Sequence, residues 1–316
     1  MATGTLKQNG QNRNPVFIFH LVGLSTRNGD PLRKPLETRP EIVEKPQMPR
    51  SADNQSRPPP DHQKELLKLF GSLAYRHSAW QVFADFAEAA AISLSNAVDW
   101  AQRDQREERY MALIKRYKPD ELAAFPKMMA ELTFAMEEEP SDVLGRTFHD
   151  LELHNKWSGQ FFSPYPLCRM MAKMTLGDEE DVRARITERG FVTAQEPVCG
   201  SGAMVIALAH EMRDLGINYQ RHLHVTAVDV DPKCVHMAYV QFALLHIPAV
   251  IVHGNTLSLE EFGRWYTPAH IMDGWTWKLR REPEGAHEVQ GVPESPKPER
   301  PDPDTEQPPP SQLTLF

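Results

Sequence analysis

The stretch Glu196-Pro-Val-Cys-Gly200-Ser-Gly202 decides the fold that the sequence predicts. It lies at the end of a β-branched run from Phe191 to Val198 and comes before a helical pattern that starts near Ala203. Two glycines where a strand turns into a helix let the backbone approach a ligand and leave helix N–H groups facing an anionic or polar group. A G-x-G pair alone is a weak signal, so its meaning depends on the segments that follow.

Two further strand ends downstream carry polar side chains. The runs from His224 to Asp231 and from Ala249 to His253 each predict a strand, and a helical pattern separates them. Strands that alternate with helices predict a parallel sheet, whose carboxyl ends form the ligand crevice of an open α/β fold. Asp229 ends the second strand, where a carboxylate can accept both ribose hydroxyls, whereas Asp231 suits the N-cap of the next helix. Asn255 brings an amide to the third strand end.

The rest of the sequence divides into two tails and a helical region. Nine of the 27 prolines fall in residues 1–61 and nine in residues 281–316. Their composition predicts a disordered N-terminal tail and a Pro-rich acidic C-terminal linker. Apolar residues at helical spacing predict a helical region over residues 62–154, in which Ser141-Asp142 caps a helix, and residues 155–280 form the predicted α/β domain.

One aromatic stripe has two interpretations. Trp80, Phe83 and Phe86 recur at helical spacing, which is more typical of a core, although exposed rings could stack on bases. The net charge of −8 argues against a protein that coats nucleic acid electrostatically, but it is compatible with a small basic groove.

The cysteines and histidines indicate a compartment but no metal site. Cys168, Cys199 and Cys234 form no C-x-x-C pair, which favours a reducing cytosol over a disulfide scaffold. The 13 histidines show no H-E-x-x-H motif or clustered spacing, so no metal site is expected. No apolar run is long enough to cross a bilayer, and we therefore expect a cytoplasmic protein.

The order of four motifs resembles the N-terminal half of the N-6 adenine-specific DNA methyltransferases. Gly159-Gln-Phe-Phe-Ser-Pro-Tyr165 precedes the glycine turn, and Asp229-Val-Asp-Pro232 and Gly254-Asn-Thr-Leu257 follow it. The modification subunits of type I restriction systems are the most similar, over roughly residues 141–257. The resemblance implies a shortened Rossmann-like sheet of the class I S-adenosylmethionine-dependent methyltransferases, with an N-terminal helical region and disordered tails.

The resemblance also implies roles for the matching positions, with S-adenosyl-L-methionine as the cofactor. A lid over its methionine end would consist of Phe161, Phe162, Ser163 and Pro164. The cofactor loop would consist of Glu196, Pro197, Cys199, Gly200 and Gly202. Asp229 would hold the ribose, and Asn255, where the family usually has Asp, would lie near the cofactor adenine.

One motif of that family is missing. An Asn/Asp-Pro-Pro-Tyr/Phe turn after strand four binds the target amine in the family and stacks on the flipped base, but no such tetrapeptide occurs in this sequence. In its place stands Tyr266-Thr-Pro-Ala-His270, where Thr267 could orient the amine and His270 or Tyr266 could stack, unless the segment is a plain turn. Few residues remain for later strands, so the first strand is expected to be an edge, covered by a strand from Ala269–Leu279, by the N-terminal helices or by a partner.

The last five residues form a separate motif. Gln312-Leu-Thr-Leu-Phe316 resembles the Q-L-[SD]-L-F peptide with which bacterial replication and repair proteins bind the sliding clamp. Gln312 would bond at the pocket rim, while Leu315 and Phe316 would fill the pocket. Alternatively, Leu313, Leu315 and Phe316 fold back onto the protein itself.

Two functions are compatible with these motifs. The first is an S-adenosylmethionine-dependent DNA methyltransferase of restriction-modification type that acts on adenine N6. The second is a catalytically inactive cofactor-binding module that acts through a specificity subunit or the sliding clamp. An RNA or small-molecule methyltransferase is less favoured, because the Gly159–Tyr165 lid belongs to the DNA family.

Overall fold

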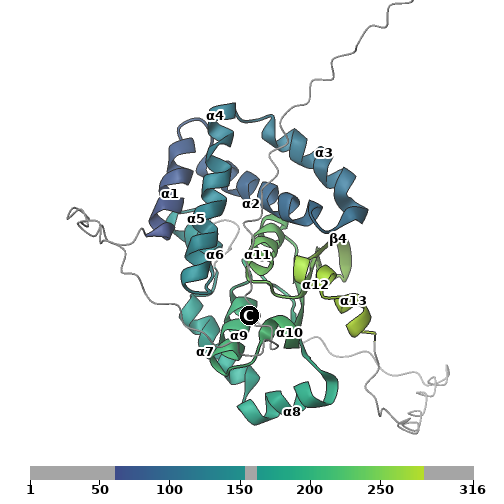
Figure 1. Ribbon diagram of the computed structural model, residues 1–316. Coiled ribbons are helices and arrows are strands. Elements are labelled where there is room, and N and C mark those ends of the chain that lie inside the picture. The colour runs from purple at the N-terminus through teal and green to yellow at the C-terminus, as the bar shows by residue number, and fades with distance from the viewer. Residues whose placement is uncertain (1–60, 154–161, 281–316) are drawn as a thin grey trace, which may run out of the picture. The chain divides into compact units, whose positions relative to one another are not determined.

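The described chain begins with a helical region, as the spacing of its apolar residues predicts (Figure 1). The computed structural model describes residues 61–153 and 162–280, which belong to one unit that ends at Arg280. The helices of the first segment are α1 (His62–Leu73), α2 (Ala79–Asn96), η1 (Trp100–Gln102), α3 (Arg103–Ile114), α4 (Pro119–Leu122), α5 (Ala124–Glu138) and α6 (Val143–Asp150).

The aromatic stripe of α2 is divided between core and surface. Phe83 and Phe86 are at most 1% exposed, and the ring centroid of Phe70 lies 5.5 Å and 5.4 Å from theirs. Aromatic rings in such tilted and edge-to-face contacts stabilise a core beyond the area that they bury. Trp80 differs, because 44% of this residue is exposed. The core interpretation therefore holds for the two phenylalanines and not for the tryptophan.

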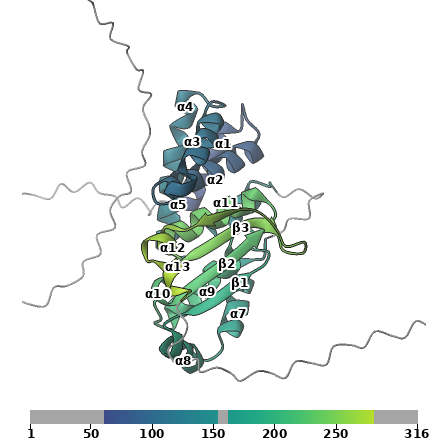
Figure 2. The same cartoon turned by 90° about the vertical axis from the view of Figure 1, so that its right-hand side faces the viewer.

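Four strands form one sheet in the order β1-β2-β3-β4 (Figure 2). The strands are β1 (Val192–Glu196), β2 (Leu223–Asp229), β3 (Ala249–Asn255) and β4 (Glu260–Tyr266). The first three are parallel, which confirms the predicted α/β fold, whereas β4 is antiparallel to β3. All three carboxyl ends of the parallel strands therefore lie at one edge of the sheet, called here the carboxyl edge.

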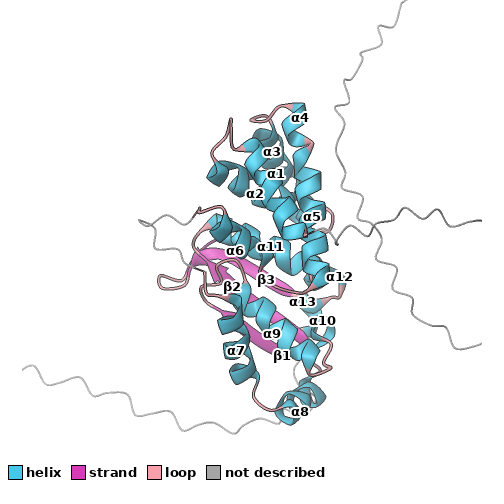
Figure 3. Ribbon diagram, turned by 90° about the vertical axis from the view of Figure 1, so that its left-hand side faces the viewer, coloured by secondary structure: helices cyan, strands magenta, loops and turns pink. Residues whose placement is uncertain are grey.

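Helices connect the strands and cover one face of the sheet. Figure 3 shows α7 and α9 in front of the strands, and Figure 2 shows the strands from the other side. Helix α11 packs against β2 and β3 and also against α2 of the helical region. The helices of this segment are α7 (Tyr165–Leu176), α8 (Glu179–Arg189), α9 (Ala203–Asp214), α10 (Tyr219–His222), α11 (Pro232–Leu244), α12 (Pro268–Met272) and α13 (Trp275–Lys278).

One continuous core joins the helical region to the sheet. The same cluster of buried side chains includes Phe86 of α2, Tyr239 of α11 and Ile251 of β3. A buried arginine adds a polar link, because Arg106 of α3 donates to the carbonyl of Arg264 in β4 at 3.0 Å. The helical region therefore holds α11 and β4 in place.

The first strand is an edge of the sheet, as the sequence predicts. Among the described residues, β1 pairs with β2 and with no other strand. Of the three alternatives for covering this edge, a strand from Ala269–Leu279 does not occur, because this segment forms α12 and α13. Trp275 of α13 is fully buried, with its ring centroid 5.2 Å from that of Phe191 at the start of β1.

Within residues 61–153 and 162–280, no helix has the length and apolar character needed to cross a membrane.

Candidate cofactor site

The glycine turn between β1 and α9 has a backbone that only glycine adopts readily. Gly200 and Gly202 have φ angles of 55° and 96°, in the left-handed region. A Cβ atom on Gly202 would lie 2.5 Å from the buried ring of Phe242. The turn is also fixed to the sheet, because the Cys199 amide donates to the Val228 carbonyl at 2.8 Å.

The carboxylate of Asp229 joins the ends of β1 and β2. Its Oδ2 accepts the Gly200 amide at 2.8 Å, and its Oδ1 accepts the Asp231 amide at 2.9 Å. The residue is 6% exposed, and this burial raises the pKa of the carboxyl group. The Val230 backbone also hydrogen-bonds to this carboxylate, which retains acceptor capacity for a ligand donor such as a hydroxyl.

Asp231 has a different position from Asp229. It is the N-cap of α11, and its Oδ1 accepts the Lys233 amide at 2.9 Å. Its Oδ2 pairs with the Lys233 ammonium group at 2.6 Å. This is the helix-capping arrangement that the sequence predicts for Asp231.

The turn after β3 is tied to the other two strand ends. Asn255 Oδ1 accepts the Leu257 amide at 2.9 Å, which closes a tight turn. The Thr256 hydroxyl donates to the Pro197 carbonyl at 2.5 Å, and the His253 ring lies 3.2 Å from the Val230 carbonyl. The structure thus brings the glycine turn, Asp229 and Asn255 together at the carboxyl edge.

Apolar side chains at the same edge are unusually exposed. Val198 follows β1, Val230 follows β2 and Leu257 follows β3, and they are 73%, 59% and 96% exposed. Sequence reasoning missed this group, because each residue is a lone apolar side chain in its own loop. Exposed apolar side chains gathered at one place mark a binding surface more often than scattered ones do.

The described part of the expected lid touches the glycine turn. Two Phe162 ring carbons lie 3.1 Å from the position of a Cβ on Gly200. The same ring packs against Phe148 and His149, with centroids 5.2 Å and 5.7 Å away. Ser163 and Pro164 lead directly into α7. Phe161 lies outside the described residues.

Two members of the expected cofactor loop are partly or fully buried. Glu196 is the last residue of β1, and burial raises the pKa of its carboxyl group. Burial also raises the pKa of the Cys199 thiol well above its ordinary value. A buried thiol of this kind stays protonated and inert near neutral pH, so we assign Cys199 no nucleophilic role.

Thr267 and His270 lie at the opposite edge of the sheet. The Thr267 hydroxyl accepts the amide of Ala249, the first residue of β3, and donates to the Ile247 carbonyl, both at 2.9 Å. The His270 ring is 2.9 Å from that of His224, near the start of β2. Since β3 runs on to Asn255, about 20 Å separates the two edges at about 3.3 Å per residue. The geometry gives no support to the catalytic roles expected for Thr267 and His270, because they cap α12 and fill a buried cluster.

A buried polar network behind the glycine turn was missed by sequence reasoning. The Ser201 hydroxyl donates to Asp142 Oδ2 at 2.5 Å, and Gln241 Nε2 donates to Asp142 Oδ1 at 2.9 Å. Gln241 Oε1 in turn accepts the Leu144 amide at 3.0 Å. The sequence marks Asp142 as a helix cap, but nothing marks Gln241 in the middle of α11. The network fixes the glycine turn to α6 and α11.

A match to one family model agrees with the resemblance that the sequence motifs indicate. The family model described as N-6 DNA Methylase matches residues 144–276. A solved structure from Listeria monocytogenes, assigned as a class I S-adenosylmethionine-dependent methyltransferase, aligns at 14% identity with a TM-score of 0.36. The alignment covers 62% of this chain and 54% of that one, so this chain spans about half of that protein. No curated protein matches the chain.

The family match implies S-adenosylmethionine as the cofactor, and the residues at the carboxyl edge fit this molecule. Asp229 offers a buried carboxylate at the end of β2, directly beside the glycine turn whose Gly200 amide it accepts, as a ribose-binding carboxylate requires. Residues 144–276 thus resemble the N-6 DNA methylases, a likeness that covers less than half of the 316-residue chain.

Proposed function

We propose that this chain binds S-adenosylmethionine at the carboxyl edge and methylates adenine N6 in DNA. The observation that carries the proposal is the meeting of the glycine turn, Asp229 and Asn255, through the Gly200–Asp229 and Thr256–Pro197 hydrogen bonds. Three neighbouring strand ends with a turn, a carboxylate and an amide form a nucleoside-binding crevice. The match of residues 144–276 to the DNA methylases supports DNA as the substrate.

Each residue group has a distinct part in the proposed reaction. Asp229 accepts hydrogen bonds from the ribose hydroxyls, and the first N–H groups of α9 face the polar methionine end. Phe162, Ser163 and Pro164 close over that end and exclude water. When bound, S-adenosylmethionine supplies an electrophilic methyl group on a sulfonium. These residues bind and orient, and none of them exchanges a proton with the target amine.

No residue at the carboxyl edge is assigned to orient the target amine. The sequence contains no Asn/Asp-Pro-Pro-Tyr/Phe turn, and Thr267 and His270 lie at the other edge of the sheet. This favours a second candidate function, a catalytically inactive cofactor-binding module that acts through a partner. That partner would be a specificity subunit or, through Gln312, Leu313, Leu315 and Phe316, the bacterial sliding clamp. These four residues lie outside the described part of the chain.

The proposal also includes a biological role and a cellular location. A restriction-modification role follows from the likeness to modification subunits, and a cytoplasmic location follows from the unpaired cysteines. Within this proposal, residues 155–280 form the cofactor-binding domain.

The methylome of an expressing host separates the two candidate functions. Plasmid DNA from cells that overproduce the chain is expected to carry N6-methyladenine in long-read sequencing, and DNA from cells with Gly200→Asp is expected to carry none. The variant forces a side chain onto a residue with a φ of 55°, against the Phe162 ring. Unmethylated DNA from the parent, alone and with a specificity subunit, would rule out the enzyme and leave the binding module.

A further inference from the structure

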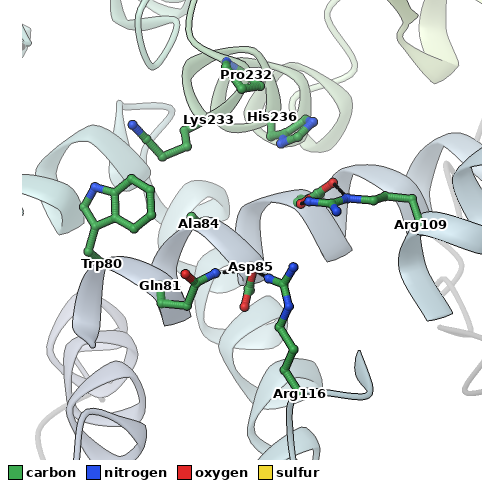
Figure 4. Close-up of a pocket in the computed structure, with 10 residues that line it drawn as sticks. Trp80, Gln81, Ala84, Asp85, Arg109, Arg116, Pro232, Lys233 and His236 are labelled. Atoms are coloured by element: carbon green, nitrogen blue, oxygen red, sulfur yellow. Dashed lines mark hydrogen bonds and ion pairs between the residues drawn. The ribbon is translucent and has the colours of Figure 1, made fainter. Parts of the chain in front are cut away.

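A cavity of about 500 Å³ lies between the helical region and the start of α11 (Figure 4). Its floor comes from α2, one end from α3, and its roof from Lys233 and His236 of α11. None of the residues expected to bind the cofactor lines it. The cavity is therefore a second site, beside the carboxyl edge and separate from it.

Three cationic groups around the cavity are each held by a carboxylate. Arg109 donates to both oxygens of Glu88, at 2.5 Å and 2.9 Å, and Arg116 donates to Asp85 at 2.8 Å. The third is Lys233, paired with the Asp231 N-cap. A carboxylate that occupies one edge of a guanidinium fixes its orientation and leaves the other N–H groups for a second anion.

The two arginines are more exposed than the carboxylates that hold them, whereas the side chains of Lys233 and Asp231 are similarly buried. The side chains of Arg109 and Arg116 are 52% and 42% exposed, whereas those of Glu88 and Asp85 are 15% and 3% exposed. Asp85 is further occupied by the Tyr117 hydroxyl at 2.8 Å. The charged groups that a ligand meets first are therefore the two guanidinium groups, although the three pairs sum to zero charge.

Trp80 gives the cavity an aromatic wall. It belongs to the stripe whose other members, Phe83 and Phe86, are in the core, so its exposure is not explained by packing. The Lys233 ammonium lies 4.9 Å from the centroid of the indole ring. An exposed indole beside fixed cations matches the combination with which proteins hold unpaired nucleotides, the base on the ring and the phosphate on the cations.

We propose that this cavity binds a short single-stranded stretch of nucleic acid, with a base against Trp80 and phosphates toward Arg109 and Arg116. Trp80 and Glu88, the partner of Arg109, are eight residues apart on α2, a distance of about 12 Å at about 1.5 Å per residue. That span suits one or two nucleotides. The inference extends the proposed DNA function by a contact that does not depend on cofactor or methyl transfer.

Fluorescence anisotropy with labelled single-stranded DNA of about ten nucleotides, within the site size of such grooves, tests the proposal. The full chain is expected to bind it, and Trp80→Ala is expected to weaken binding by about fivefold or more, since one stacked base contributes at least that much. Trp80→Phe keeps a stacking ring and is expected to bind nearly as well as the parent. Trp277→Ala, which removes a tryptophan that is 73% exposed elsewhere, is the control.

A matched arginine pair tests the phosphate contact. Arg109→Gln is expected to weaken binding and to reduce the slope of log affinity against log salt by roughly one half to one. Arg183→Gln is its control, because the Arg183 side chain is 51% exposed and paired with Glu179 on α8, outside the cavity. The control is expected to leave both quantities unchanged.

Competition experiments show whether the site prefers a single strand to a free nucleotide or a duplex. A separate calorimetric measurement distinguishes failure of this proposal from failure of the proposed function. Deoxyadenosine monophosphate and a duplex of the same sequence should compete much less than the unlabelled single strand. Equal competition by the free nucleotide would refute strand binding. No binding by the parent, or unchanged binding by Trp80→Ala and Arg109→Gln, would refute the site itself. Calorimetry with S-adenosylmethionine on the same variants should be unaffected, so failure of one proposal is distinguishable from failure of the other.

Discussion

The Gly200 amide donates a 2.8 Å hydrogen bond to Oδ2 of Asp229, and this contact ties the glycine turn to the end of the neighbouring strand. Residues 29 positions apart in the chain thereby share one small volume. The relationship explains why a glycine turn and a strand-end carboxylate occur together, since each fixes the conformation that the other needs. It also predicts which substitutions change the stability of the fold and which change the affinity for the cofactor.

Gly202→Ala is expected to lower the free energy of unfolding by more than about 1 kcal/mol, because a φ of 96° is strained for alanine. The added Cβ would also meet the fully buried Phe242 ring at 2.5 Å. Gly71→Ala is the control, since Gly71 lies within α1 with nothing inside 4 Å of its Cβ position. That control is expected to be stabilised by about 0.5–1 kcal/mol. Urea denaturation measures both, and equal stability of the two variants would contradict the reasoning.

Gln241→Ala is expected to destabilise the protein by about 1–3 kcal/mol, because it leaves the buried Leu144 amide without its side-chain acceptor and removes one of the hydrogen bonds to the Asp142 carboxylate. The glycine turn should also loosen, which hydrogen exchange at the Ser201 amide would detect. Gln105→Ala on α3 removes an exposed glutamine from a helix and serves as the control. An equally small effect of both substitutions would show that the network contributes nothing.

Thr267→Val is expected to act on stability and not on the cofactor. The hydroxyl that it removes accepts the Ala249 amide and donates to the Ile247 carbonyl, and the residue is fully buried. Loss of these bonds should cost about 1–3 kcal/mol in urea denaturation, with unchanged affinity for S-adenosylmethionine in calorimetry. A large change in affinity with unchanged stability would instead place Thr267 in the functional site.

Acid is expected to destabilise the fold between about pH 6.5 and pH 4. Burial lowers the pKa of His224 and the pKa of His236 from 6.5 to about 4. For His224, the neighbouring His270 ring is a second, smaller cause of this shift. The unfolded chain takes up protons on these rings near pH 6.5, whereas the folded chain does so only near pH 4, so stability is lost as the pH falls through this window.

The slope of stability against pH reports the contribution of one ring. Each histidine contributes up to about 1.4 kcal/mol per pH unit within the window. His224→Gln should therefore reduce the slope measured by urea denaturation between pH 6.5 and pH 4.5. An identical slope in the parent and in His224→Gln would show that this ring is not buried in its neutral form.

The parallel part of the sheet could be predicted because its signals are local. An apolar strand followed by Gly200, Asp229 or Asn255 gives the direction of each strand and the edge at which its end lies. Parallel pairing of neighbouring strands then needs only the helices between them, which the spacing of apolar residues also reveals.

Strand β4 could not be predicted from its own residues. The segment Glu260–Tyr266 carries two acidic residues and a glycine, a pattern without alternation, and it is a strand only because β3 pairs with it. Leu259, with a φ of 58°, turns the chain back without a glycine to signal the hairpin. Because β4 runs antiparallel to β3, Thr267 follows it beside the start of β3 instead of at the carboxyl edge.

Contacts between distant segments account for the other omissions. Gln241 is polar in an apolar helix for a reason that lies at Asp142, nearly 100 residues earlier. Trp80 belongs by spacing to a core stripe, and only the position of α11 shows that it lines a cavity. Neither relationship leaves a pattern in the neighbouring sequence.

Titration calorimetry of the full chain with S-adenosylmethionine, comparing the parent with Asp229→Ala and Asp231→Asn, is the measurement that bears most directly on the carboxyl edge. The parent should bind in the micromolar range, and loss of a charge-assisted pair of ribose contacts should weaken Asp229→Ala by about tenfold or more. Asp231→Asn keeps a capping side chain and should bind like the parent. Absence of binding heat in the parent, or equal affinity of the parent and Asp229→Ala, would contradict the assignment of this crevice to the cofactor.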